Sequence, residues 1–314
     1  MYTYAPDSAR AIEAMKPSPF EHLWAQDVDH VVRALVEHGG DARIIAGGQS
    51  LVPMLALRMA RPELLVDINR AAGLGSYALD DGVLSVEAAV TARTLERDRP
   101  LMERFPMLAE ALRWIAHPEI RNRTTVCGSL AHADPAAELP ALALALDATL
   151  HAVSVEGRRA VPASDFFVGP YMTALEEGEF LASIDLPVPR HEDGWAVGEI
   201  ARRRGDFALV GAAGLLRLHD DGRTCQQARL ALFGVAGRPV RAHLLEEQLV
   251  GVELDPGVLA EASQASFDGV EVFGDIHGSA TYRQRAGRVL VARTLVSAFN
   301  RIPARPASKD GRNP

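Results

Sequence analysis

The chain has 314 residues, of which 48% are hydrophobic and 24% are charged, and this balance indicates a globular protein of two or three domains. Its net charge of −8 argues against a surface for nucleic acids or anionic membranes, and no stretch reaches the roughly 20 apolar residues that span a bilayer. The N-terminal segment "MYTYAPDSARAIEAMKP" lacks an apolar core of signal-peptide length, so we expect a cytoplasmic protein.

Cysteine and lysine are too scarce for several kinds of site. Cys127 and Cys225 lie far apart, so the chain offers neither a disulfide framework nor the four thiolates that normally hold an iron–sulfur cluster. The only lysines, Lys16 and Lys309, lie near the chain ends. Their positions exclude a phosphate-loop Gly-Lys-Ser/Thr motif and an interior lysine for a Schiff base.

The first elements follow from apolar spacing and glycine. A helix is expected over residues 28–36, because Asp27 is a typical N-cap, valines and leucine recur at helical spacing, and Gly39-Gly40 ends the pattern. The next segments predict a buried strand at 43–46, a short helix at 51–58 and a second strand at 63–68. Gly47-Gly48 then lies in a loop at the carboxyl end of a strand. Adjacent glycines there indicate that something approaches the backbone closely.

Helices give way to strands in the second half of the chain. The pattern predicts a strand at 82–90 and helices at 91–98, 106–115 and 141–148, the last one buried. Further strands are expected at 149–155, 158–167, 179–188, 195–203, 208–220 and 229–236, and helices at 241–251 and 279–299. The polar, proline-bearing tail, residues 303–314, is expected to be disordered.

Three features that resemble functional motifs have plainer interpretations. "GLGSYA", residues 73–78, fits a loose dinucleotide pattern, but a turn and a strand follow it where a helix is required. His30 and His38 are expected to be surface residues of the first helix. Cys127 is expected to be a small apolar residue in a packed turn, with a histidine-activated nucleophile as the alternative.

The segment "TTVCGSLAHADPAAELP", residues 124–140, is chemically richer. Thr125 and Ser129 supply hydroxyls, Gly128 permits close approach, and Asp134 and Glu138 can accept hydrogen bonds from a sugar or ribityl chain. Backbone N–H groups in such glycine-bearing loops suit phosphate oxygens even without lysine. Together with "AGGQS", residues 46–50, the chain has two loops suited to a pyrophosphate and its polyol neighbours. Two structural glycine turns are the alternative.

Four motifs in order resemble the FAD-binding medium subunit of the molybdenum hydroxylases, the family of carbon monoxide dehydrogenase and xanthine dehydrogenase. They are "AGGQSLVPMLALRMARPELLVDI", "HPEIRNRTTVCGSLAHADPAAELPA", "EGEFLASIDLP" and "ARRRGDFALVGAA". The resemblance implies an α+β protein. It would combine a two-subdomain FAD-binding fold of the vanillyl-alcohol-oxidase/p-cresol-methylhydroxylase type with a C-terminal α+β domain of antiparallel sheet and helices. The implied parts are residues 18–70, 71–190 and 193–302.

The same resemblance implies a set of FAD contacts, with the pyrophosphate against both glycine segments. The first cradle would be Ala46, Gly47, Gly48, Gln49, Ser50 and Leu51. The second would be Thr125, Gly128 and Ser129, with His132, Asp134 and Glu138 nearby. Ile115 and Ala116 would lie beside the flavin ring, Leu181 near the adenine or ring system, and Glu199 and Phe207 near the ring.

Some positions depart from the pattern of the relatives. Cys127 precedes Gly128 where many relatives have two glycines, and Ser129 replaces a frequent asparagine. Glu199 stands where some relatives have a lysine, which would stabilise a reduced, anionic flavin as a glutamate would not. Phe207 has a second interpretation, as a core residue of the C-terminal domain.

The resemblance also implies partners and a role. A small subunit with 2Fe-2S clusters would pass electrons to the FAD of this chain and on to an external acceptor. A large subunit would hold the molybdenum cofactor and perform the hydroxylation. The chain would then need no catalytic acid–base residue and no metal of its own, and a dimer of heterotrimers is expected. A self-sufficient flavin oxidase and a non-redox nucleotide-binding regulatory protein are the alternatives.

Overall fold

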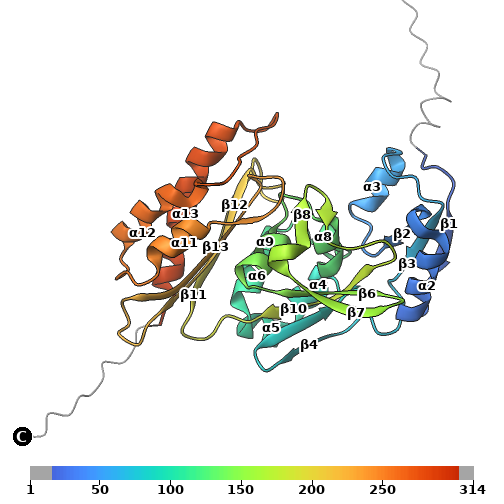
Figure 1. Ribbon diagram of the computed structural model, residues 1–314, viewed down its shortest axis with the longest axis horizontal. Coiled ribbons are helices and arrows are strands. Elements are labelled where there is room, and N and C mark those ends of the chain that lie inside the picture. The colour runs from blue at the N-terminus through green and yellow to red at the C-terminus, as the bar shows by residue number, and fades with distance from the viewer. Residues whose placement is uncertain (1–15, 304–314) are drawn as a thin grey trace, which may run out of the picture. The chain divides into compact units, whose positions relative to one another are not determined.

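The computed structural model describes residues 16–303, so the tail expected to be disordered, 303–314, lies outside the described residues except for its first residue. Two compact units are present, and each is assembled from separate chain segments (Figure 1). Unit 1 contains the residues up to Arg104, Ile115–Asp134 and Asp147–Pro187. Unit 2 contains Phe105–Trp114, Pro135–Leu146 and the residues from Val188 onward. The expected boundaries at 18–70, 71–190 and 193–302 stay predictions.

A small parallel sheet opens unit 1. Its strands are β1 (Glu21–Trp24), β2 (Ala42–Ile45) and β3 (Leu64–Asp67), in the order β1-β3-β2. Helix α2 (Val28–His38) and the 3-10 turn η1 (Gly39–Asp41) precede β2, and α3 (Leu51–Ala56) joins β2 to β3. The central strand β3 is fully buried. The expectation of a buried strand was wrong for β2, because it lies at an edge of the sheet and exposes Arg43.

The predicted start of α2 is confirmed in detail. The Asp27 carboxylate accepts a hydrogen bond from the backbone N–H of His30 at 2.8 Å, and this satisfies one of the unpaired donors of the first turn. Gly39 ends the helix with a φ of 50°, a left-handed value that a glycine adopts without strain.

The larger sheet of unit 1 is antiparallel. It contains β4 (Tyr77–Asp80), β5 (Val83–Glu87), β10 (Phe180–Pro187), β6 (Thr149–Ser154) and β7 (Gly157–Pro162), in this spatial order. The same unit contains α4 (Ala92–Arg97), α5 (Arg99–Arg104), α7 (Pro118–Arg121), α8 (Val126–His132), α10 (Ala163–Phe166), β8 (Phe167–Gly169) and β9 (Met172–Thr173). The strand expected at 158–167 was wrong beyond residue 162. Strand β7 ends at Pro162, which is a poor strand residue, and the helical turn α10 follows it.

Unit 2 is built on one antiparallel sheet of β11 (Gly194–Ile200), β12 (Val210–Leu218), β13 (Cys225–Phe233) and β14 (Val240–Arg241). Helices α11 (His243–Leu249), α12 (Pro256–Ala262), η2 (Ser263–Phe267) and α13 (Ala280–Asn300) cover one face (Figure 1). Gly194 and Gly198 of β11 let α13 approach, since side chains there would meet Ala298 and Leu290. Helices α6 (Pro106–Trp114) and α9 (Glu138–Ala145) pack on the other face. In residues 16–303, no helix is both long enough and apolar enough to cross a membrane.

Candidate functional site

The carbonyl groups of the first glycine segment are tied to the protein. The side chain of Asn69 donates to the carbonyl of Ala46 at 2.8 Å, and the Arg123 guanidinium donates to the carbonyl of Gly47 at 3.2 Å. The carbonyl of Gly48 accepts from the N–H of Val52 at 3.0 Å, as the chain enters α3. Neither Asn69 nor Arg123 was predicted from the sequence.

The backbone N–H groups of the same segment, unlike its carbonyls, are not bonded to the part of the protein that the structure describes. Across residues 16–303, no protein acceptor is recorded for the backbone N–H of any residue from Gly47 to Leu51. Five successive backbone donors without a protein acceptor make this stretch of backbone partially positive. Such a run of donors suits the oxygens of a phosphate or pyrophosphate.

The close approach expected at Gly47 is present, and the approaching group is the protein's own backbone. A Cβ atom on Gly47 would lie 2.1 Å from the carbonyl oxygen of Arg123 and 3.1 Å from the Cα of Thr124. Gly48 has a φ of 72°, which side chains rarely adopt. Both glycines are therefore required by the fold itself, and neither one by itself identifies a ligand.

The second glycine segment was predicted as a loop, and this was wrong. Thr125 is the N-cap of helix α8, and its hydroxyl accepts from the N–H of Gly128 at 3.1 Å. A Cβ on Gly128 would lie 2.5 Å from that hydroxyl oxygen and 3.9 Å from the Cβ of Ala46. Since Ala46 begins the first glycine segment, the two segments that the sequence analysis paired do meet within unit 1.

A polar and aromatic cluster follows the C-terminus of α8. The rings of His132 and Tyr171 lie with centroids 5.1 Å apart, and the N–H of Tyr171 donates to the carbonyl of Ala133 at 3.1 Å. Partial burial lowers the pKa of His132, although Asp134 opposes this effect. Partial burial and the Asp134 carboxylate, to which the phenol is hydrogen-bonded, raise the pKa of Tyr171. Tyr171 was missed because it is distant in sequence and belongs to no motif.

A buried arginine holds the segment at Ile115 and Ala116. The Arg121 guanidinium donates to the carbonyl of Ile115 at 2.8 Å and to that of Ala116 at 3.0 Å. Its remaining donors form a two-point ion pair with Glu96, at 3.0 and 3.1 Å. Burial alone would raise the pKa of Glu96, but hydrogen bonds from Arg121 and Arg93 hold it below its usual value. Leu181, by contrast, is buried in β10 of the large sheet.

Three of the predicted site residues belong to unit 2. Glu138 is the first residue of α9, Glu199 lies near the end of β11, and Phe207 lies in the loop before β12. Glu199 is only 8% exposed, and neither carboxyl oxygen has a hydrogen-bond partner within the described part of the chain. Burial, with a further contribution from Glu138, raises the pKa of Glu199 to about 8. Phe207 is 69% exposed, so its interpretation as a core residue is wrong.

Two of the features set aside in the sequence, "GLGSYA" and Cys127, have no functional role in the structure, whereas His30 and His38 are partly buried and not fully exposed. "GLGSYA" runs directly into strand β4, without a helix. Cys127 is buried, its thiol lies 3.6 Å from the carbonyl of Val86, and burial raises the pKa of the thiol. A raised pKa is the reverse of what a nucleophilic cysteine needs.

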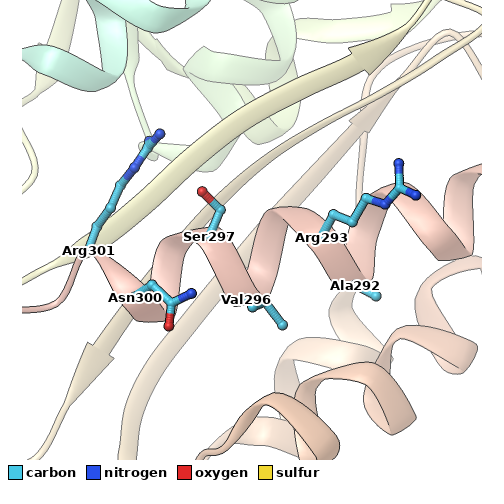
Figure 2. A pocket seen from close by; sticks show the side chains of 6 residues that line it. All are labelled: Ala292, Arg293, Val296, Ser297, Asn300 and Arg301. Carbon is cyan, nitrogen blue, oxygen red and sulfur yellow. The ribbon is translucent and has the colours of Figure 1, made fainter.

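A hollow of about 530 Å³ lies on unit 2 beside α13. Figure 2 shows its lining, which consists of Ala292, Arg293, Val296, Ser297, Asn300 and Arg301. These residues project from α13 and its C-cap, and α13 covers the sheet face opposite to Glu199. Arg301 is already paired with Glu110 at 2.8 Å. The hollow contains none of the predicted site residues.

The chemistry of unit 1 fits a dinucleotide cofactor such as FAD. The unpaired N–H groups of residues 47–51 suit an anionic pyrophosphate, and the segment at Gly128 lies beside them. Hydroxyl and carboxylate groups follow along α8 and its C-terminal end, at Ser129 and Asp134. These groups are the hydrogen-bonding partners that the hydroxyls of a polyol chain require.

Comparisons with known proteins agree with this chemistry. Residues 18–189 match the FAD binding domain in molybdopterin dehydrogenase, and residues 195–298 match the CO dehydrogenase flavoprotein C-terminal domain. The 6-hydroxypseudooxynicotine dehydrogenase complex subunit alpha of Paenarthrobacter nicotinovorans is 41% identical, over 94% of this chain and 99% of its own length.

Solved structures give the same result. A chain of carbon monoxide dehydrogenase from Hydrogenophaga pseudoflava has a TM-score of 0.88 and 36% identity, covering 92% of this chain and 100% of that one. A chain of quinoline 2-oxidoreductase from Pseudomonas putida 86 has a TM-score of 0.86 and 39% identity, covering 91% of this chain and 99% of that one.

An FAD-binding domain followed by a flavoprotein C-terminal domain defines a flavoprotein of the oxidoreductase class. The chain belongs to the family of FAD-binding medium subunits of the molybdenum hydroxylases. The family, the α+β fold class and the FAD-binding domain expected from the sequence motifs are thereby confirmed.

Proposed function

We propose that this chain is the FAD-binding electron-transfer subunit of a molybdenum-containing hydroxylase. It would pass electrons from a 2Fe-2S subunit through FAD to an external acceptor. The observation that supports this most directly is the row of unpaired N–H groups from Gly47 to Leu51 beside Gly128, inside the region matched to the FAD-binding family. FAD, when bound, supplies one- and two-electron redox chemistry, and the chain supplies binding and orientation.

The proposal assigns roles to predicted site residues of unit 1. The N–H groups of residues 47–51 hold the pyrophosphate, and Ser50, Thr125 and Ser129 border it. His132 and Asp134 hydrogen-bond the polyol hydroxyls. Ile115 and Ala116, kept in position by Arg121, lie beside the flavin ring, and Leu181 lies near the adenine or the ring system.

The partners belong to the same proposal. Relatives are named as the alpha or medium subunits of multi-subunit enzymes. By analogy, this chain would associate with a small iron–sulfur subunit and a large molybdenum-binding subunit, as a cytoplasmic dimer of heterotrimers. Co-expression with such subunits should yield one complex on gel filtration. A medium chain that elutes alone after co-expression would contradict the assembly.

The cradle is tested best by adding charge without disturbing the fold. Ser50 is the N-cap of α3 and its side chain makes no capping hydrogen bond, so Ser50→Asp suits the helix terminus while placing a carboxylate against the pyrophosphate. We expect FAD affinity to fall by about tenfold or more, because like charges at short range oppose binding. The measurement is FAD titration of the apoprotein beside thermal unfolding.

Ser279→Asp is the matched control. Ser279 is the N-cap of α13 in unit 2, and its hydroxyl accepts from the N–H of Tyr282, a role that aspartate also performs. This variant should bind FAD as the parent chain does. Equal FAD affinity in both variants would reject the cradle, and a folded parent chain that never takes up FAD would reject the function. Substrate oxidation by the isolated chain would favour a self-sufficient flavin oxidase.

A further inference from the structure

The hairpin of β8 and β9 in unit 1 holds an exposed tyrosine in a strained backbone conformation. Tyr171, in the turn between the two strands, has a φ of 56°, in the left-handed region that residues other than glycine rarely adopt. Its side chain adds little to the core, because the residue is 59% exposed. Strain of this kind persists only where the surrounding structure enforces it, and it is concentrated at functional sites.

Two contacts fix Tyr171 to the C-terminal end of helix α8. Its backbone N–H donates to the carbonyl of Ala133 at 3.1 Å, and Ala133 itself has a left-handed φ of 50°. Its phenol is hydrogen-bonded to the carboxylate of Asp134. Partial burial and this carboxylate raise the pKa of the phenol, which therefore stays protonated at neutral pH. The two residues that follow α8 thus hold both the backbone and the side chain of Tyr171.

One side of the Tyr171 ring is packed, and the rest of the ring is accessible. The imidazole of His132, in the last turn of α8, lies with its centroid 5.1 Å from that of the phenol ring, at an interplanar angle of 45°. Val168 and Met172 of the same hairpin are 50% and 59% exposed. An accessible aromatic ring among exposed apolar side chains, supported from behind by a second ring, is typical of a surface that binds a flat ligand.

Helix α8 connects this ring with the glycine segments. Gly128 lies in the first turn of α8, beside Ala46 of the first glycine segment, and His132 is the last residue of the helix. The stretch from Gly128 to His132 makes about one helical turn, or roughly 6 Å along the axis. A ribityl chain, which separates a pyrophosphate from the ring of a flavin, spans a similar length. All of these residues belong to unit 1.

The hydrogen bond to Asp134 selects between the two rings of FAD. A phenol that donates its proton to a carboxylate gains electron density in its ring. The oxidised isoalloxazine ring is electron-poor, whereas adenine is electron-rich, so stacking on Tyr171 favours the isoalloxazine. Reduction adds electrons to that ring and weakens the contact. An aromatic partner of this kind therefore binds oxidised FAD more tightly than reduced FAD.

We propose that Tyr171 is a flavin-binding residue, whose accessible ring stacks on the isoalloxazine ring of FAD. His132 and Asp134 also act as positioning residues, because they hold the phenol in place. This inference rests on the proposed function, since that function supplies the FAD. By favouring oxidised FAD, the contact lowers the reduction potential and makes the reduced cofactor a better donor to the external acceptor.

A glycine variant and a matched control test the contact. Tyr171→Gly removes the ring and relieves the left-handed strain, so the apoprotein should be at least as stable as the parent. Its FAD affinity should fall about tenfold, a usual effect of losing one aromatic stacking partner, and the reduction potential of the bound FAD should rise. Asp81→Gly relieves the same kind of strain in the exposed turn between β4 and β5, and it should change neither property. The measurements are FAD titration by fluorescence, redox titration of the bound FAD and thermal unfolding.

Tyr171→Phe separates the ring from its hydrogen bond. It should keep most of the FAD affinity, because the ring remains, while the absorption spectrum and reduction potential of the bound flavin shift toward those of Tyr171→Gly. A tyrosine with only a structural role would move neither. Unchanged affinity in Tyr171→Gly, or lost affinity with an unchanged flavin spectrum and potential, would overturn the inference and leave the proposed function standing. A folded parent chain that does not bind FAD would overturn the proposed function and the inference with it.

Discussion

Gly47 and Gly128 show that a glycine near a cofactor can be required by the protein around it. A side chain at Gly47 would collide with the Arg123 carbonyl, and one at Gly128 would collide with the hydroxyl that caps α8. Substituting these glycines therefore cannot separate lost binding from a disturbed fold. Ser50 is the more informative position, because aspartate suits its place at a helix terminus.

Gly47→Ala should destabilise the apoprotein by about 1–3 kcal/mol, the usual cost of forcing extra atoms into a packed region. The comparison is Gly40→Ala, since a Cβ on Gly40 would meet nothing within 4 Å. Urea unfolding of both apoproteins measures the difference. Equal stability of the two variants would show that the Arg123–Thr124 backbone moves away readily.

Phe207→Ala should leave the free energy of unfolding within about 0.5 kcal/mol of the parent value, because the side chain is exposed. Phe233→Ala, at a fully buried ring, should cost about 3–5 kcal/mol. A large loss in the Phe207 variant would restore the packing role. If Phe207 lies beside the flavin, its removal should also change the flavin absorption spectrum without destabilising the protein.

Side chains within motifs were easier to predict than those that support them. Thr125, Gly128 and Ser129 stand in one run of sequence, and a polyphosphate-binding chemistry follows from their types. Arg121 acts through carbonyls and a distant glutamate, so its role exists only in the folded chain. Asn69 was accessible to reasoning, since it follows the strand parallel to β2 and such strands end at one edge.

Helix α8 depends on its N-cap more than on its composition. Its seven residues include Gly128 in the first turn, and glycine weakens a helix by about 1 kcal/mol relative to alanine. The Thr125 hydroxyl compensates by accepting from the Gly128 N–H. A short, capped helix of this kind carries little apolar periodicity, which is why the sequence suggested a loop.

Thr125→Ala should therefore cost about 0.5–2 kcal/mol, the range found for loss of an N-cap side chain. Thr125→Ser retains the capping oxygen and should recover most of that loss. Chemical unfolding of the two variants and the parent makes the comparison. Equal losses in both variants would assign the role to the threonine methyl group, which is buried.

The helices and strands differ in how far nearby residues of the sequence determine them. For α2, the cap, the apolar spacing and the terminal glycine all lie within the segment, and the sequence sufficed. Strand β1 has only four residues and is defined by its pairing with β3, more than 40 positions further on, which no local pattern encodes. The end of β7 is local, because it falls at Pro162, a residue that the predicted strand at 158–167 ran through.

Across the whole molecule, two kinds of carboxyl group change the stability of the fold in opposite directions as the pH changes. Glu179 is ion-paired with Arg159, which lowers its pKa, so its contribution to stability is present above its unfolded-state pKa and lost as pH falls. Glu199 has a raised pKa of about 8 in the folded protein. Its contribution to stability is therefore present below its unfolded-state pKa and is lost as the pH rises from there to about 8. Stability should therefore be greatest at about pH 5.

Urea unfolding across pH tests this profile. The Glu199 contribution gives an alkaline-side decline of at most about 1.4 kcal/mol per pH unit. Glu199→Gln should flatten that side and leave the acid side unchanged. A parent chain whose stability rises steadily from acid to about pH 8 would show that Glu199 does not control the profile.

The interleaving of the two units along the chain has a consequence for biosynthesis. Helices α6 and α9 belong to unit 2, but the ribosome makes them before any strand of the sheet they cover. Seven of the eight residues of α9 are buried in the finished protein, and all seven are apolar. On the growing chain this apolar surface of α9 stays exposed while the remaining residues of unit 1 are synthesised. Newly made chains should therefore be substrates for chaperones that bind exposed apolar helices until β12 and β13 emerge.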